Sequence, residues 1–318
     1  MFLIDDAVII EIFGIRMYAF GVYVALGALC ALAVISVMTM TYGMKSGSAA
    51  MIMLFASVFG ILFSRIAFCL MNRDINMLNN LHAWPQINSG GWSMFGLIGG
   101  VFIGGRISAA VLKQNPGKIS DILCLALLPF MTAERIAENR IDYFDVSRSL
   151  DSEIFQNSFL AVGDGEPVLA TYYITAACMS ILFVILMIYA IRRKEQDGKL
   201  TIRFTLLFGS VSIITESLRY DFFLSISFVG LQQVAAAITL AVGVILAVKR
   251  SNRPKSVLTY AAISSIPIMT GIIIGLEFAL DRTMWNKILV YCAMIITVSI
   301  PAGLGMKLLS QEKGNEKA

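Results

Sequence analysis

The chain has 318 residues, of which 58% are hydrophobic and only 14% are charged, and its mean hydropathy is +0.78. Soluble domains hold roughly 45–50% apolar and about 25% charged residues, so this composition excludes a soluble protein and indicates an integral membrane protein. The net charge of +4 says little by itself, because the side of the membrane on which basic residues fall matters more than their sum.

Several segments are long and apolar enough to cross a bilayer, which takes about 20 residues per helix. In chain order they predict an all-α, polytopic transmembrane helix bundle of about nine spans. The predicted spans are 17–42, 48–71, 92–112, 119–137, 167–191, 201–218, 228–248, 256–280 and 287–308.

The connections between these spans alternate in charge. Fifteen of the 25 Lys and Arg residues follow the first, third, fifth and seventh spans or lie at the C-terminus, whereas seven lie on the opposite side. Cytoplasmic loops carry the excess of basic residues in membrane proteins. We therefore expect the N-terminus outside, the C-terminus in the cytoplasm, and the long acidic loop at 138–166 outside.

Counting residues excludes several kinds of chemistry. The single histidine, His82, lies in a predicted external loop, so any Ser-His-Asp or Cys-His nucleophile must use it. A zinc site would need several nitrogen or sulfur ligands, and no glycine-rich loop ends in Gly-Lys-Ser/Thr as a P-loop does. We expect no metal, no cofactor and no nucleic-acid partner.

Charged side chains remain inside three of the predicted spans, toward their outer ends. Arg65, for example, lies about 9 Å below the end of its helix at 1.5 Å per residue. Burying an arginine in a bilayer costs roughly 2.5–3.5 kcal/mol, and gathered guanidinium groups suit a phosphate. An anion site and a structural ion-pair network both fit this pattern. The outer group, with a tyrosine that opens the first helix, comprises Tyr18, Arg65, Glu134, Arg135, Glu138, Glu216 and Arg219.

Other features of the spans have simpler interpretations. Arg106, near the cytoplasmic end of its span, is expected to snorkel to the interface, and Glu277 to be an ordinary helix-end carboxylate. Gly96, Gly100 and Gly104 are spaced four apart, a doubled GxxxG stripe. Such a stripe is typical of close helix packing, although it also lets a lipid chain approach.

A series of stretches in this sequence follows one order and spacing over about residues 8–248. They are "FGIRMYAFGVYVALG", "FSRIAFCLMN", "SGGWSMFGLIGG", "SDILCLALLPFMTAERIAENRIDYF", "GSVSIITESLRYDFF" and "GLQQVAAAITLAVGVIL". Together they resemble the prolipoprotein diacylglyceryl transferase family. The resemblance implies a core of seven helices at 1–250, followed by two additional C-terminal transmembrane helices at 251–318.

This resemblance also implies a reaction. The family moves diacylglycerol from phosphatidylglycerol to the lipobox cysteine of a prolipoprotein, in the outer leaflet of the bacterial cytoplasmic membrane. By position, the family's phosphatidylglycerol-binding residues correspond to Arg135, Arg65, Glu216 and Tyr18, and its catalytic arginine corresponds to Arg219. The candidate bases for the cysteine thiol are Glu138 and Glu134. Membrane lipids and the prolipoprotein peptide are the implied partners.

Two departures from the family pattern leave the activity open. Phe95 stands where the family has a catalytically important histidine, and Glu138 replaces an asparagine. Three hypotheses follow: a divergent diacylglyceryl transferase, a non-catalytic relative that binds phospholipid or lipoprotein, and a membrane transporter. The transporter is the weakest, because the sequence has no convincing internal repeat and its charges favour one leaflet.

Overall fold

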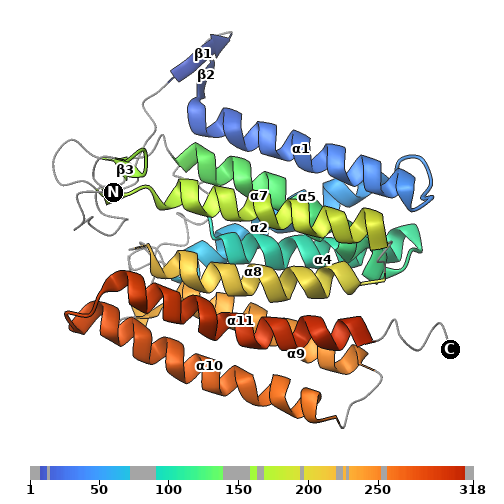
Figure 1. The fold of residues 1–318 in the computed structure, drawn as a ribbon. Helices are drawn as coiled ribbons and strands as arrows, with labels where there is room; N and C mark the ends of the chain where they lie inside the picture. The colour runs from blue at the N-terminus through green and yellow to red at the C-terminus, as the bar shows by residue number, and fades with distance from the viewer. Residues whose placement is uncertain are drawn as a thin grey trace. The chain divides into compact units, whose positions relative to one another are not determined.

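The computed structural model describes residues 8–12, 15–71, 91–138, 158–162, 168–193, 197–219, 225–226, 229–251 and 256–311. Over these ranges the chain is mainly helical, with three short two-stranded hairpins (Figure 1). It divides into two compact units. The first is Met1–Gly198 with Leu218–Phe222, and the second is Lys199–Ser217 with Phe223–Ala318.

In the first unit α5 packs against α1, α4 and α7, and α2 packs against α4 and α1. Residues 121–128 of α5 are all buried, so this helix forms the core of the unit. The pKa of Tyr42, which caps the end of α1, is raised by burial and by the negative charge of Asp121. The helices are α1 (Ala19–Thr41), α2 (Ser48–Met71), α4 (Met94–Leu112), α5 (Pro116–Ala137) and α7 (Thr171–Arg193).

Two hairpins belong to the same unit. Strand β1 (Val8–Ile12) pairs antiparallel with β2 (Ile15–Tyr18), and β3 (Ala161–Val162) pairs with β4 (Val168–Leu169). The sequence predicted the first span from residue 17, but the helix begins at Ala19 because Met17 and Tyr18 pair with β1 in the hairpin. Tyr18 ends β2 and is the N-cap of α1.

Helices α2 and α4 are in backbone contact along the glycine stripe. A Cβ atom added to Gly96, Gly100 or Gly104 would collide with main-chain atoms of α2, among them the carbonyl oxygens of residues 63, 59 and 55. The stripe therefore serves close helix packing and not the approach of a lipid chain. We call this contact the α2–α4 glycine seam.

The start of α5 holds the last residues of the first unit in place. Asn115 caps the helix by accepting a hydrogen bond from the Gly117 N–H at 2.8 Å, and its amide donates to Asp197 Oδ1 at 3.0 Å. Asp121, which is fully buried, accepts from the Gly198 N–H at 2.8 Å. Asp197 and Gly198 both have positive φ, of 62° and 90°. The chain thus leaves the first unit through a fixed turn.

The second unit is built around α8, which packs against α9 and α11, while α10 packs against α9 and α11. The rings of Phe204 and Phe208 stack within α8. Strands β5 (Ser225–Ile226) and β6 (Val229–Gly230) form a hairpin before α9. The helices are α8 (Lys199–Ser217), α9 (Leu231–Arg250), α10 (Val257–Arg282) and α11 (Lys287–Gln311).

A buried carboxylate joins two helices of this second unit. Glu277 of α10 is 2% exposed and accepts a hydrogen bond of 2.6 Å from the Gln233 amide of α9. The same amide donates to the Ile213 carbonyl at 3.2 Å. The expectation of an ordinary helix-end carboxylate was therefore wrong, because the Glu277 side chain is buried and hydrogen-bonded to another helix.

The prediction of a helical, multi-pass membrane protein is confirmed. Among the described residues nine long helices lie close to the nine predicted spans, and eight of them are long and apolar enough to cross a membrane. The other is α5, which is 22 residues long but carries Lys118, Asp121, Glu134 and Arg135. The orientation of the termini stays a prediction.

Candidate functional site

The last turn of α5 presents an arginine between two carboxylates. Arg135 Nη1 donates to Glu138 Oε1 at 2.5 Å, and Arg135 Nε lies 3.5 Å from Glu134 Oε2. Glu138 follows three residues after Arg135, so the helical period brings both side chains to neighbouring positions. Arg135 is 5% exposed and Glu138 7%, whereas the Glu134 side chain is 27% exposed.

A second arginine reaches the same carboxylate from a distant part of the chain. Arg219 follows the end of α8 and lies in the segment Leu218–Phe222 of the first unit. Its Nη2 is 3.4 Å from Glu138 Oε1, and its side chain is 9% exposed. One carboxylate oxygen thus faces two guanidinium groups. We call Glu134, Arg135, Glu138 and Arg219 the arginine–glutamate network.

The start of α4 supplies a further contact to this network. Arg135 Nη2 donates a hydrogen bond to Met94 Sδ at 3.3 Å. Met94 is the first residue of α4, and Ser93 before it caps the helix by accepting from the Gly96 N–H at 3.3 Å. Ser93 is fully buried and is joined to Ser64 of α2 by two hydrogen bonds, from Ser93 N to Ser64 O at 3.2 Å and from Ser64 Oγ to Ser93 O at 2.8 Å. The position of Met94 is therefore fixed by α2.

Arg65 stabilises the segment that leads into α4. It is 6% exposed, its Nη1 donates to the Gly91 carbonyl at 2.9 Å, and its guanidinium lies 5.5 Å from the centre of the Phe68 ring. Next to Gly91 along the chain come Trp92, Ser93 and Met94. Arg65 is thus connected to Arg135 through the start of α4.

The structure also describes the other two predicted site residues, Tyr18 and Glu216. Tyr18 stands at the start of α1 and is 41% exposed. Glu216 is 8% exposed in the last turn of α8, three residues before Arg219, and belongs to the second unit. His82 lies outside the described residues. The structure brings together four of the seven predicted site residues in one network and joins Arg65 to it indirectly.

Sequence reasoning missed the contribution of Met94. An apolar methionine at the start of a membrane helix has no local feature that marks it as a hydrogen-bond acceptor, and its partner lies 41 residues away. Ser93 was quoted in the motif of the third span, but its bonds to Ser64 connect positions 29 residues apart. These contacts arise only when α2, α4 and α5 pack together.

The network has the chemistry of an anion site with a nearby base. Two guanidinium groups offer donors in a fixed planar geometry that matches phosphate, and the carboxylates can accept a proton. Formal charges of the four side chains cancel. In the part of the chain that the structure describes, no group of three or more His, Cys, Asp or Glu side chains is placed to hold a metal ion.

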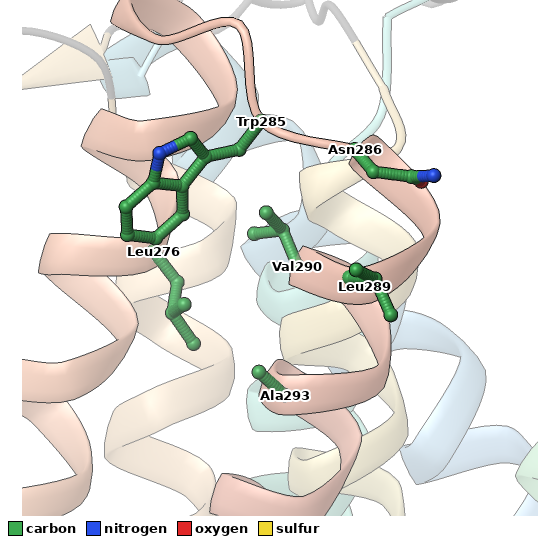
Figure 2. A pocket seen from close by; sticks show the side chains of 6 residues that line it. All are labelled: Leu276, Trp285, Asn286, Leu289, Val290 and Ala293. Carbon is green, nitrogen blue, oxygen red and sulfur yellow. The ribbon is translucent and has the colours of Figure 1, made fainter.

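A pocket of about 370 Å³ lies in the second unit, between α10 and α11. Figure 2 shows the Trp285 ring and Leu276 on one side and Leu289, Val290 and Ala293 on the other. Apart from Asn286, its lining is apolar or aromatic, and it carries no charged group. Such a pocket does not provide phosphate recognition, so the network of the first unit remains the candidate site.

The sequence was also compared with known proteins. No curated protein matches the chain. The sequence model of the prolipoprotein diacylglyceryl transferase family matches residues 7–249, a range that contains every residue of the arginine–glutamate network. Because this match covers most of the chain, the protein belongs to the prolipoprotein diacylglyceryl transferase family.

Proposed function

We propose that the protein transfers diacylglycerol from phosphatidylglycerol to the lipobox cysteine of a prolipoprotein. The reaction takes place in the outer leaflet of the bacterial cytoplasmic membrane. Family membership supports a transferase of lipoprotein biosynthesis that acts on lipids and prolipoproteins. The donor lipid, the leaflet and the roles of individual residues are our proposal.

One observation carries the proposal: Arg135 and Arg219, 84 residues apart in sequence, converge on a single point at Glu138 Oε1. Separate segments of the chain supply the two guanidinium groups, and both are nearly buried. Guanidinium groups bind phosphate through paired, charge-assisted hydrogen bonds. In this proposal Arg135 and Arg219 hold the lipid phosphate, and Arg65 holds the segment that leads into α4. A lipid-binding role for Tyr18 and Glu216 stays a prediction from the family resemblance.

The proposed reaction forms a C–S bond and breaks a C–O bond. The cysteine sulfur attacks the carbon of the diacylglyceryl unit that is bonded to the phosphate oxygen. This oxygen takes the electron pair of the broken C–O bond and leaves as part of glycerol phosphate. The phosphodiester has one negative charge and the released phosphate monoester gains a second. Arg135 and Arg219 would stabilise this developing charge in the transition state.

A base must take the proton of the cysteine thiol. Phe95 occupies the position of the family histidine, and its ring has no group that accepts a proton. Glu138 is the leading candidate because its carboxylate lies beside both arginines, and Glu134 is the second because it contacts Arg135 and is more exposed. Either carboxylate would bring the proton acceptor next to the lipid phosphate.

Phe95 favours one other function. A relative that has lost the histidine and keeps the arginines would bind phospholipid or prolipoprotein without transferring diacylglycerol. Both functions use the same phosphate contacts. The transferase modifies a lipobox peptide and the non-catalytic relative does not, so an experiment with this peptide distinguishes the two functions.

The test uses purified full-length protein. Arg135→Ala and Arg219→Ala should each weaken binding of phosphatidylglycerol by roughly ten- to a hundredfold, the worth of a charge-assisted contact. Arg106→Ala is the matched control, because this arginine is exposed on α4, and its binding should stay at the wild-type value. Equal binding by all four proteins would disprove the phosphate site.

Transfer is measured on the same samples with a lipobox peptide, by the mass gained on its cysteine. Modification by the wild type and its loss in Arg135→Ala and Arg219→Ala support the transferase. If the wild type binds phosphatidylglycerol but leaves the peptide unmodified, the non-catalytic function is correct.

A further inference from the structure

Glu138 occupies the point where the two arginines meet. Its Oε1 lies 2.5 Å from Arg135 Nη1 and 3.4 Å from Arg219 Nη2. A phosphate oxygen that bridged both guanidinium groups would take this same position. We infer that the Glu138 carboxylate is a built-in occupant of the phosphate position, which the donor lipid must displace from at least one arginine. This inference rests on the proposed function.

The charges of the network support this inference. Arg135 and Arg219 are balanced by Glu134 and Glu138, and three of these four side chains are nine-tenths or more buried. A phosphate that enters beside Glu138 would put a further negative charge into a balanced, desolvated group, which is unfavourable. Displacement of Glu138 removes this conflict, because one anion then takes the place of another.

The local structure allows Glu138 to move without its partner. Glu138 follows the last residue of α5 and is its C-cap, so a rotation of its side chain requires no change in the body of the helix. Arg135 is held independently, by Met94 Sδ on Nη2 and by Glu134 on Nε. Once Glu138 moves, Arg135 Nη1 still points to the position that the carboxylate has left. Met94 is thus a positioning residue for Arg135.

A purely structural role for Glu138 leads to the opposite expectation. If the carboxylate only holds the two guanidinium groups together, its neutralisation would leave two like charges close to each other. The arginines would then move apart, and phosphatidylglycerol would bind more weakly. The sign of the change in affinity therefore separates an occupant of the phosphate position from a structural counter-ion.

The experiment measures binding to the full-length protein in detergent with three soluble probes: dihexanoyl phosphatidylglycerol, dihexanoyl phosphatidylcholine and glycerol phosphate. Glu138→Gln should bind phosphatidylglycerol about tenfold or more tightly than the wild type. The gain should be smaller for phosphatidylcholine, whose headgroup is zwitterionic. A gain that is as large for glycerol phosphate as for the lipid would identify the free phosphate ester, and not the lipid, as the competing anion.

Controls separate this inference from the proposed function. Glu11→Gln changes the net charge by the same amount at an exposed strand position and should bind like the wild type. Thermal unfolding of both Glu138 variants shows whether they fold. If Glu138→Gln does not fold, Glu138→Asn, with its shorter amide, should show the same gain in affinity for phosphatidylglycerol. Unchanged or weaker binding in both Glu138 variants overturns the inference while the proposed function stands, provided that Arg135→Ala still weakens binding. If Arg135→Ala binds normally, the proposed function fails instead.

Discussion

Arg135 uses each nitrogen of its guanidinium group on a different partner. Nε faces Glu134, Nη1 donates to Glu138 and Nη2 donates to Met94. The two hydrogen bonds, from Nη1 and Nη2, set the plane of the group, and the contact of Nε with Glu134 at 3.5 Å adds an ion pair. Lysine carries the same charge as a single point on a flexible stem, so it reproduces the charge of Arg135 without this geometry.

The first prediction follows from this geometry. Arg135→Lys should bind phosphatidylglycerol nearly as poorly as Arg135→Ala, with a loss of roughly ten- to a hundredfold in affinity. Binding of a short-chain phosphatidylglycerol to the purified variants measures the effect. Arg106→Lys, at an exposed position of α4, should not change it. Recovery of wild-type affinity in Arg135→Lys would mean that charge alone is recognised.

The second prediction concerns proton transfer. A cysteine thiol has a pKa of about 8.5, and its proton has to leave before or during the attack on the lipid. We expect Glu138→Gln to abolish diacylglycerol transfer to a lipobox peptide although the variant still binds phosphatidylglycerol, and His82→Ala to transfer normally. The readout is the mass of the peptide. Equal transfer by Glu138→Gln and the wild type would eliminate Glu138 as the base.

Residue positions could be predicted where they depend on the helical period, and not where they depend on packing. The spacing of Glu134, Arg135 and Glu138 along one helix was enough to place them together. Depth in the membrane and family resemblance predicted that Arg219 lies at the same level, but not that it contacts Glu138. Met94 gave no such signal. The burial of Glu277 was missed because its partner Gln233 lies on another helix.

At the scale of helices, the α2–α4 glycine seam determines where α4 begins. The seam runs from Gly96 to Gly104, and the bonds between Ser93 and Ser64 lie one turn before it. Backbone contact along the seam fixes the height of α4 relative to α2. Because Met94 is the first residue of α4, the same contact sets the position of the sulfur that orients Arg135.

The third prediction uses two neighbouring glycines of α4. Gly100→Ala should lower the melting temperature, because its Cβ would collide with the backbone of α2, and overpacking typically costs about 1–3 kcal/mol. Gly99→Ala is the matched control, since a Cβ there meets nothing within 4 Å and alanine favours the helix. Thermal unfolding in detergent compares them. Equal melting temperatures would show that the seam tolerates a methyl group.

The helices themselves were predictable because a bilayer demands about 20 apolar residues in each span. The short strands could not be predicted in this way. Residues 8–12 and 15–18 are as apolar as a helix start, yet they pair as β1 and β2. The β-branched side chains of β1 favour a strand, but a hydropathy pattern does not distinguish these residues from the helix that follows.

For the whole molecule, the membrane orientation depends on whether α5 crosses the bilayer. Among the helices that the structure describes, eight meet the length and hydropathy that a crossing needs, and α5, with its charged ends, is the exception. If α5 crosses, the segment before α7 lies on the side opposite to the loop after α1. If it does not, both lie on the same side. The excess of basic residues predicts the first arrangement.

The fourth prediction tests this arrangement by labelling single cysteines in a variant without the five native ones. Phe159→Cys, before α7, should react with a membrane-impermeant reagent in intact cells, because the position is 80% exposed and is expected outside. Ser46→Cys, in the exposed turn after α1, should react only after the cells are opened. Labelling of both positions in intact cells, or of neither, would refute the orientation.

In the proposed function, the glycine seam also limits how a phospholipid reaches the arginines. Along the seam α2 and α4 leave no room for one added carbon atom, so an acyl chain does not pass between them. A lipid diffusing sideways in the bilayer meets a closed wall on this flank. In the proposed function, the donor lipid and the modified peptide therefore use routes other than this seam.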